Sequence, residues 1–325
     1  MKWIEWAVVG VLIFFPFATI NQIDVELMRQ TMLLELRYDA AMDAAVDAAA
    51  QALIINADQQ HESRYESVKR VAVNTEEALT AFYRTLYTNF GISGDPVAQG
   101  VLNRYIPVIV VIGYDGFYVY AEDEWTDRNG QTVMAPAWGT KRPYAYTDSS
   151  GNSYSFTLDE QVLVYAAATR SWHEGFRRDI QAEANIPLLR DAALFHEVRL
   201  STIVGAIQDE LSYRINKHNE VALRNGLSYT FILPSIPLEE WHNTIADVGV
   251  VAFMQGIPMG RKVYNNYALG GSRVMKQTEI VGAMKDNMKV YYRRSCPYSY
   301  PIEETFASEK TAAQQGYMPL SCSSF

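Results

Sequence analysis

Three His-Glu pairs are the residues of this sequence that come closest to a known catalytic motif. They are His61-Glu62, His173-Glu174 and His196-Glu197. Each pair begins the H-E-x-x-H pattern, in which two histidines four positions apart bind zinc, but the second histidine is replaced by Tyr, Arg and Leu, in that order. The sequence also contains no G-x-S-x-G, P-loop or G-x-G-x-x-G pattern. We therefore expect a chain that is not an enzyme and has no cofactor or metal site.

Two rows of residues at four-residue spacing are the most specific pattern in the chain. One row is a seam of small residues, Ala40, Ala44, Ala48 and Ala52, beside a second alanine row, Ala41, Ala45 and Ala49. The other row is an acidic ridge of Glu35, Asp39, Asp43 and Asp47. On a helix, small ridges let backbones approach closely, whereas like charges four residues apart destabilise by a few tenths of a kcal/mol per pair. A basic partner surface, a solvated face or a bound cation would each compensate for the acidic ridge.

The elements that must position these rows begin with an apolar run over residues 6–20. Together with residues 3–5 it provides about 18 residues, enough to cross a bilayer core if Glu5 reaches the headgroups, and Pro16 bends such a span without forbidding it. No A-x-A cleavage site follows, so we expect a retained anchor. Glu5 either lies at headgroup depth or pairs with the amine or Lys2 of an adjacent subunit.

Composition narrows the classes of function further. The net charge of −9 argues against nucleic acid as a primary partner, because phosphate binding needs clustered positive charge. The chain has two cysteines, Cys296 and Cys322, each flanked by turn-forming residues near the C-terminus. They suit a disulfide that closes a loop in an oxidising, external compartment, although two free thiols remain the alternative.

The periodicity of the sequence predicts an α+β fold, with a long N-terminal helix that spans a membrane or is amphipathic, followed by an exterior domain of antiparallel hairpins and helices. Three regions follow from it: an anchor and long helix over 1–55, a helical connector over 56–104, and an α+β exterior domain over 105–325 with the cysteine loop. The expected helices cover 3–55, 61–73, 75–89, 159–184, 188–224 and 238–255. The expected linker, hairpins and strand cover 91–100, 106–120 with the turn Asp115-Gly116, 144–158 and 229–233.

Taken together, Glu5, Pro16, the alanine and aspartate helix and the Cys296/Cys322 loop resemble the type IV filament superfamily of type IV pilins, pseudopilins and tight-adherence pilus subunits. The resemblance covers residues 1–55 and the cysteine loop, about a quarter of the chain. It implies a helix that holds the subunit in the membrane and then packs in a filament core, with Glu5 neutralising a neighbour's terminal amine.

The expected function is therefore that of a structural subunit of an extracellular, pilus-like filament or of a secretion or adhesion apparatus. Its expected partners are other copies of itself or related subunits, membrane lipid before assembly, and the assembly machinery. We expect it in the cell membrane as a single-pass protein and in the extracellular filament. A monomeric, membrane-anchored receptor or sensor, for which the helix is only a stalk, is the alternative.

Overall fold

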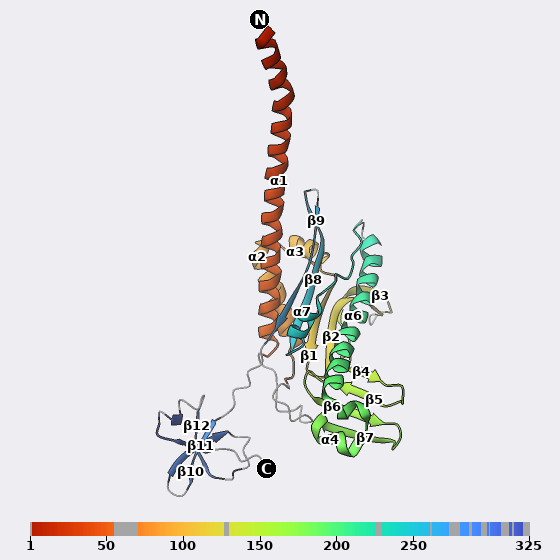
Figure 1. Cartoon of the computed structure of the whole chain (residues 1–325), viewed down its shortest axis with the longest axis vertical. Helices are drawn as coiled ribbons and strands as arrows, with labels where there is room; N and C mark the ends of the chain where they lie inside the picture. The colour runs from red at the N-terminus through yellow and green to blue at the C-terminus, as the bar shows by residue number, and fades with distance from the viewer. Residues whose placement is uncertain are drawn as a thin grey trace. The chain divides into compact units, whose positions relative to one another are not determined.

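The computed structural model of the chain describes residues 2–54, 71–126, 130–224, 226, 229–260, 262–272, 280–285, 288–293, 298, 300–306, 312–313 and 315–320, without the side chains of 2–13, 16, 17 and 293. The chain divides into two compact units, Met1–Val274 and Met275–Phe325. Figure 1 draws the elements of both, and each unit is described by itself.

Helix α1 (Lys2–Ala52) is the longest element of the first unit. It is continuous, as expected, because good helix formers follow one another from Asp24 onward and no Gly or Pro interrupts them. Its C-terminal half lies against the sheet and helix α2, while its N-terminal half continues past the end of the sheet (Figure 1). The docked half of α1 is thus held by the domain, and the other half is not.

The expected fold class, with its membrane-spanning helix, is wrong. Within the described residues, no helix combines the length and the apolar content needed to cross a membrane. Charged residues recur along α1 from Asp24 onward, so the apolar run at the start of the helix does not continue past that residue. After the helices that follow α1, the strands form three mostly antiparallel sheets, so extended sheets organise the chain where separate hairpins among helices were expected.

A five-stranded antiparallel sheet in the order β3-β2-β1-β8-β9 forms the centre of the first unit. Its strands are β1 (Val108–Gly113), β2 (Gly116–Thr126), β3 (Thr132–Trp138), β8 (Gly249–Met259) and β9 (Lys262–Gly271). The expected first hairpin is confirmed as β1 and β2, but its two-residue turn is Tyr114-Asp115, because Gly113 pairs with Gly116. Every residue of β1 is buried, which requires cover on both faces of the sheet.

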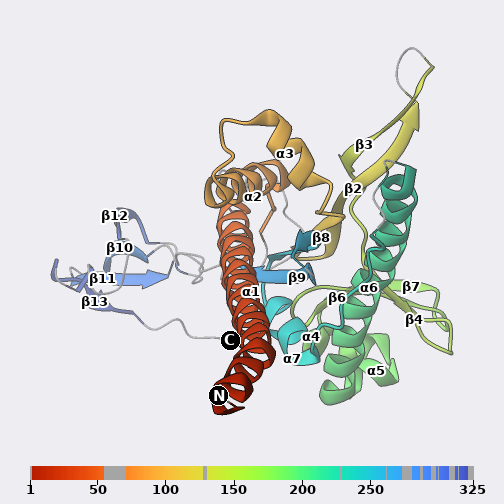
Figure 2. The ribbon, with the colours of Figure 1, turned by 90° about the horizontal axis from the view of Figure 1, so that it is seen from above.

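Helices cover both faces of this sheet (Figure 2). On one face, α1 lies against α2 (Thr75–Phe90). Helix α3 (Pro96–Asn103) follows α2 in the chain. Asn74 caps α2 by accepting a hydrogen bond from the Glu77 amide, which satisfies one of the free amides at the start of the helix. The segment expected to be a linker instead contains α3, which begins because Asp95 accepts from the two following free amides.

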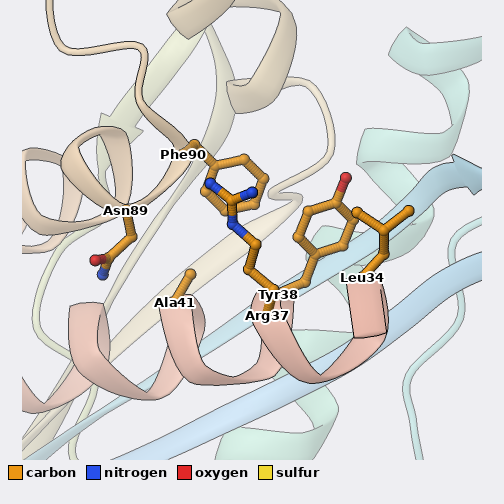
Figure 3. A pocket seen from close by; sticks show the side chains of 6 residues that line it. All are labelled: Leu34, Arg37, Tyr38, Ala41, Asn89 and Phe90. Atoms are coloured by element: carbon orange, nitrogen blue, oxygen red, sulfur yellow. The ribbon is translucent and has the colours of Figure 1, made fainter. Parts of the chain in front are cut away.

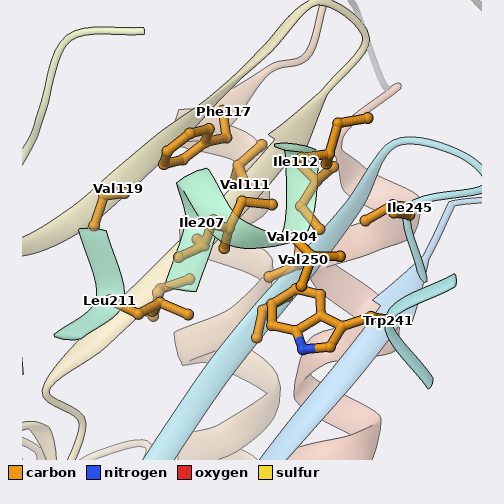
Figure 4. Close-up of a cluster of buried hydrophobic side chains, with 14 of the residues drawn as sticks. Val111, Ile112, Phe117, Val119, Val204, Ile207, Leu211, Trp241, Ile245 and Val250 are labelled. Carbon is orange, nitrogen blue, oxygen red and sulfur yellow. The ribbon is translucent and has the colours of Figure 1, made fainter. Parts of the chain in front are cut away.

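The other face of the sheet is covered by α6 (Ala192–Arg224) and by the short helix α7 (Leu238–Thr244). Figure 4 shows their apolar side chains gathered with those of β1, β2 and β8 in one buried cluster. The single helix expected over 188–224 is present as two helices, α5 (Pro187–Arg190) and α6, with a break at Asp191. The first unit also contains a second antiparallel sheet of β4 (Tyr144–Thr147), β5 (Ser153–Phe156), β6 (Gln161–Ala166) and β7 (Ser171–Phe176), followed by α4 (Arg177–Ala184), and its strand β4 contacts α6. Its first two strands are the expected second hairpin.

Two sequence predictions for this unit are wrong. The helix expected over 159–184 is β6, β7 and α4, because Val162, Val164 and Ala166 alternate inward and β6 pairs with β5. The helix expected over 238–255 ends with α7, since the apolar run after it becomes β8 and pairs with β1. Most of the helix expected over 61–73 lies outside the described residues, and 71–73 are not helical.

The strand expected over 229–233 is also absent, although this segment is described. Two side-chain amides take the place of a neighbouring strand there. Asn219 bonds both the amide and the carbonyl of Phe231, at 2.6 and 2.8 Å, and Gln255 bonds those of Ile232, at 3.0 and 2.7 Å. These amides therefore bond backbone groups that a neighbouring strand would otherwise pair, and the segment forms no ladder.

A buried ionic network joins α6 to β2 and its neighbours. Arg214 contacts Glu210 at 2.8 Å and Asp123 at 3.0 Å, and its side chain is 9% exposed. Lys217 adds a 2.6 Å contact to Asp123, and Arg142 a 2.8 Å contact to Glu210. The hydrogen bond from Lys217, and after it that from Arg214, outweigh burial and hold the pKa of Asp123 well below its ordinary value.

The second unit contains a four-stranded sheet in the order β12-β10-β11-β13. Its strands are β10 (Ile280–Lys285), β11 (Met288–Arg293), β12 (Ile302–Phe306) and β13 (Met318–Pro319), and only the β11 and β13 pair is parallel. Cys296 and Cys322 belong to this unit but lie outside the described residues, so the expected disulfide stays a prediction.

Candidate assembly surface

The two alanine rows of α1 lie on different sides of the helix. Ala41, Ala45 and Ala49 are buried against the chain's own domain. Ala40 and Ala44 are exposed, Ala48 is half-buried, and Ala52 is buried where the helix ends. The predicted seam of small residues is therefore divided between a face packed on the domain and a face that the domain leaves free.

Close packing explains why the second alanine row is small. Gly270 of β9 lies so near α1 that a Cβ atom there would come within 2.8 Å of the Val46 side chain and 3.2 Å of its carbonyl oxygen. Tyr38 of α1 adds aromatic contacts to both neighbours. Its ring stacks on that of Phe90 of α2, with the centroids 5.0 Å apart, and meets that of Tyr264 of β9 edge-on, with the centroids 5.3 Å apart. The free face of α1 consequently lies on a helix that is rigidly docked.

The acidic ridge follows the border between the docked face and the free face. Asp39 is half-buried and accepts hydrogen bonds from the Tyr264 hydroxyl at 2.7 Å and from the Asn266 amide at 2.6 Å. Burial, followed by the hydrogen bond to Asp39, raises the pKa of Tyr264, so this hydroxyl remains a donor at neutral pH. Two neutral hydrogen-bond donors thus stabilise the negative charge of Asp39. A basic partner surface was one of the ways in which we expected the charges of the acidic ridge to be compensated.

We expect Asp39→Ala to lower the free energy of unfolding by about 1–3 kcal/mol, because the Tyr264 hydroxyl, on a residue only 1% exposed, would lose its acceptor. Adding Tyr264→Phe removes the unpaired hydroxyl and should recover part of the loss, which urea unfolding would measure. Strictly additive costs of the two substitutions would contradict this coupling.

The remaining acidic residues, Glu35, Asp43 and Asp47, are exposed, and no basic side chain pairs with them in the described part of the chain. Burial, followed by the charges of Asp39 and Asp47, raises the pKa of the Asp43 carboxyl above its ordinary value. Asp43 also borders an open cavity of about 270 Å³ with Glu240, Thr244 and Tyr267 among the lining residues. Glu240 accepts a 3.0 Å hydrogen bond from Tyr267, which fixes a second carboxylate beside Asp43.

Asp43→Asn should raise the free energy of unfolding at pH 7 by about 0.5 kcal/mol, since it removes two like-charge contacts of a few tenths each. A pKa that is higher in the folded than in the unfolded state means that stability falls as Asp43 ionises, above about pH 4. The gain should therefore be present at pH 7 and absent at pH 3 in urea unfolding. The exposed Asp209 gives the control Asp209→Asn, which removes a carboxylate charge outside the acidic ridge. An equal gain at both pH values for Asp43→Asn would contradict the assignment.

A second cavity lies on the opposite side of the exposed alanines. It has a volume of about 120 Å³ between α1 and the C-terminal end of α2 (Figure 3). Arg37 borders it together with Leu34, Tyr38, Ala41, Asn89 and Phe90, and Figure 3 shows its side chain rising from α1 toward α2. No carboxylate pairs with Arg37 among the described residues, so its charge is available to a partner.

The exposed alanine row continues toward the N-terminus as a row of large apolar side chains. Leu36, Met32 and Met28 precede Ala40 at the same four-residue spacing and are 56%, 63% and 70% exposed. We call the row of Met28, Met32, Leu36, Ala40 and Ala44 the apolar ridge. Further apolar residues of α1 are also strongly exposed, among them Phe14, Phe15, Ile20, Ile23, Val25 and Leu33.

Sequence reasoning identified the alanine and acidic rows but missed their most informative neighbours. The spacing of Met28, Met32 and Leu36 was readable from the sequence, since it extends the row of Ala40 by the same four residues. Tyr264, Asn266 and the cavity residues could not be found that way, because they come from distant strands and helices. Glu5 and Pro16 lie in α1, but their side chains are outside the described residues, so their predicted roles stay predictions.

Comparison of the chain with models of known protein families, with curated proteins and with solved structures finds no match in any of the three. The described residues also contain no group of three or more His, Cys, Asp or Glu side chains placed to hold a metal ion. The apolar ridge and its flanks therefore carry what can be inferred about function.

Proposed function

We propose that the chain is a structural subunit that associates with other copies of itself through α1 to form an extracellular, pilus-like filament. The observation that carries the proposal is the apolar ridge, whose five side chains are exposed and follow one four-residue row of α1. Contiguous apolar side chains of this kind are rare on monomeric proteins and mark interaction sites. Burying a Met or Leu side chain contributes about 1.5–3 kcal/mol, so the three large residues alone provide a substantial driving force.

The form of the ridge favours another helix as the occupant. Side chains four residues apart make the ridges that interlock when two helices pack, and small residues allow the closest approach of the backbones. The small side chains of Ala40 and Ala44 would allow a second helix to come close. Met28 and Met32, on the same row, would add apolar surface to the contact. The resemblance of residues 1–55 to type IV filament subunits supports the same occupant, namely α1 of another copy.

The receptor alternative gains less support from the cavities beside α1. Their volumes of about 120 and 270 Å³ fall below the roughly 300 Å³ at which small-molecule sites begin. The larger one holds two carboxylates, Asp43 and Glu240, in an open setting. Such a site suits a basic group on a neighbouring surface better than an enclosed ligand.

Sedimentation of the purified full-length chain over a range of concentrations, with negative-stain electron microscopy, tests the proposal. We expect concentration-dependent association into fibres of constant width. Met32→Lys should prevent it, because a charge would be buried in the ridge, whereas Leu223→Lys, which changes an apolar residue that is 73% exposed on α6, should not. A monomer at every concentration, or fibres unaffected by Met32→Lys, would contradict the proposal.

A further inference from the structure

The apolar ridge is flanked by charges of opposite sign. In the sequence, each residue of the acidic ridge comes directly before a residue of the four-residue row that runs from Leu36 to Ala48. The acids therefore lie along one flank of the apolar ridge. Arg29 and Arg37 immediately follow Met28 and Leu36, so the arginines lie along the other flank. The free face of α1 thus presents an acidic side and a basic side that are separated by apolar side chains.

The domain extends this asymmetry beyond the helix. On the acidic side, Asp43 borders the open cavity that also holds Glu240. On the basic side, Arg37 borders the smaller cavity against α2, where Asn89 and Phe90 lie (Figure 3). Asp43 and Arg37 both lack an oppositely charged partner among the described residues. Each side therefore offers one charge that no described residue of the chain neutralises.

We propose that, in the assembly on which the proposed function rests, the cavity beside Asp43 and Glu240 receives the Arg37 guanidinium of a second copy whose α1 runs parallel. Two helices that face each other through the same ridge bring opposite flanks together when they run parallel, and like flanks together when they run antiparallel. The parallel arrangement places arginines against acids, and the antiparallel one places acids against acids, which electrostatic complementarity disfavours.

The spacing of the charges also sets the displacement between the two copies. Arg29 and Arg37 are eight residues apart, and so are Glu35 and Asp43. A displacement of six residues, about 9 Å along a helix, therefore brings Arg37 opposite Asp43 and Arg29 opposite Glu35 at once. Because the contact is displaced, one copy contributes its arginines and the other its acids, so the contact is heterologous.

Charge exchange between the two flanks tests this pairing in the full-length chain. Arg37→Glu and Asp43→Arg should each raise the concentration needed for assembly about tenfold or more, because each puts like charges opposite one another. The double variant Arg37→Glu with Asp43→Arg restores an opposite pair and should assemble near the wild-type concentration. Arg178→Glu, at an arginine with a side chain 71% exposed on α4, is the control for the charge change and should have no effect.

The outcomes separate this inference from the proposed function. Circular dichroism would first establish that each variant is folded, and Arg37→Gln, expected to weaken assembly less than Arg37→Glu, would replace a variant that is not. If wild-type chain assembles and the single exchanges assemble equally well, or if the double exchange gives no rescue, the pairing is wrong while the proposed function stands. A wild-type chain that never assembles overturns both.

Discussion

Ala44→Leu is expected to abolish assembly while it leaves the free energy of unfolding within about 0.5 kcal/mol of wild type. Ala44 is exposed on the free face of α1, and Leu is nearly as good a helix former as Ala, so the fold has no reason to change. Added bulk at the point where two helices approach most closely, however, forces their backbones apart. Sedimentation and thermal unfolding of the same sample would measure both effects.

The neighbouring substitution Ala45→Leu provides the matched control. Ala45 is fully buried against the domain, one residue away on the same helix. Overpacking there should cost about 1–3 kcal/mol of stability, because Ala45 is fully buried and a larger side chain would have no exposed space to turn into. The same chemical change would thus act on assembly at one position and on folding at the next. Loss of stability in Ala44→Leu, or normal assembly of that variant, would contradict the assignment of the free face.

Arg214→Ala should lower the free energy of unfolding by about 3 kcal/mol, at the low end of the cost of breaking a buried ion pair. The side chain of Glu210 is 5% exposed and would lose its 2.8 Å partner, although Arg142 still contacts it. Asp123 would likewise keep Lys217. These remaining contacts are why the expected cost is not larger.

The stability contributed by Asp123 should depend on pH. Its pKa is depressed in the folded state, so its contribution is present above the unfolded value near 4 and is lost as the pH falls below it. The difference between wild type and Arg214→Ala should therefore narrow in urea unfolding below about pH 4. Arg178→Ala, which removes an exposed 3.6 Å pair, should change stability by less than about 0.5 kcal/mol at any pH. A pH-independent difference for Arg214→Ala would argue against the role of Asp123.

Local signals in the sequence predicted the elements that depend on local chemistry. The uninterrupted helix formers of α1, the Asn74 cap of α2 and the turn-forming residues between β4 and β5 each specify their own segment. Predictions failed where distant residues decide the conformation. Asn219 and Gln255, which lie in other elements, bond the backbone of Phe231 and Ile232 in place of a strand, and pairing with β5 makes a run that also fits a helix into β6.

The candidate site shows the same division. Ala40, Ala44 and the acidic ridge could be identified because helix geometry alone places them in rows. Which row the domain buries could not be predicted, since that depends on Gly270 and Tyr264 in β9, more than 200 residues later in the sequence. The split of the alanines into a docked and a free row is thus a property of the tertiary structure.

Cryo-electron microscopy of the assembled full-length chain would test most directly whether α1 is the surface through which copies associate. The account predicts neighbouring α1 helices that run parallel, touch along Met28, Met32, Leu36, Ala40 and Ala44, and are displaced by about 9 Å. Assemblies in which copies meet through other surfaces, with the apolar ridge of each α1 left exposed, would contradict it.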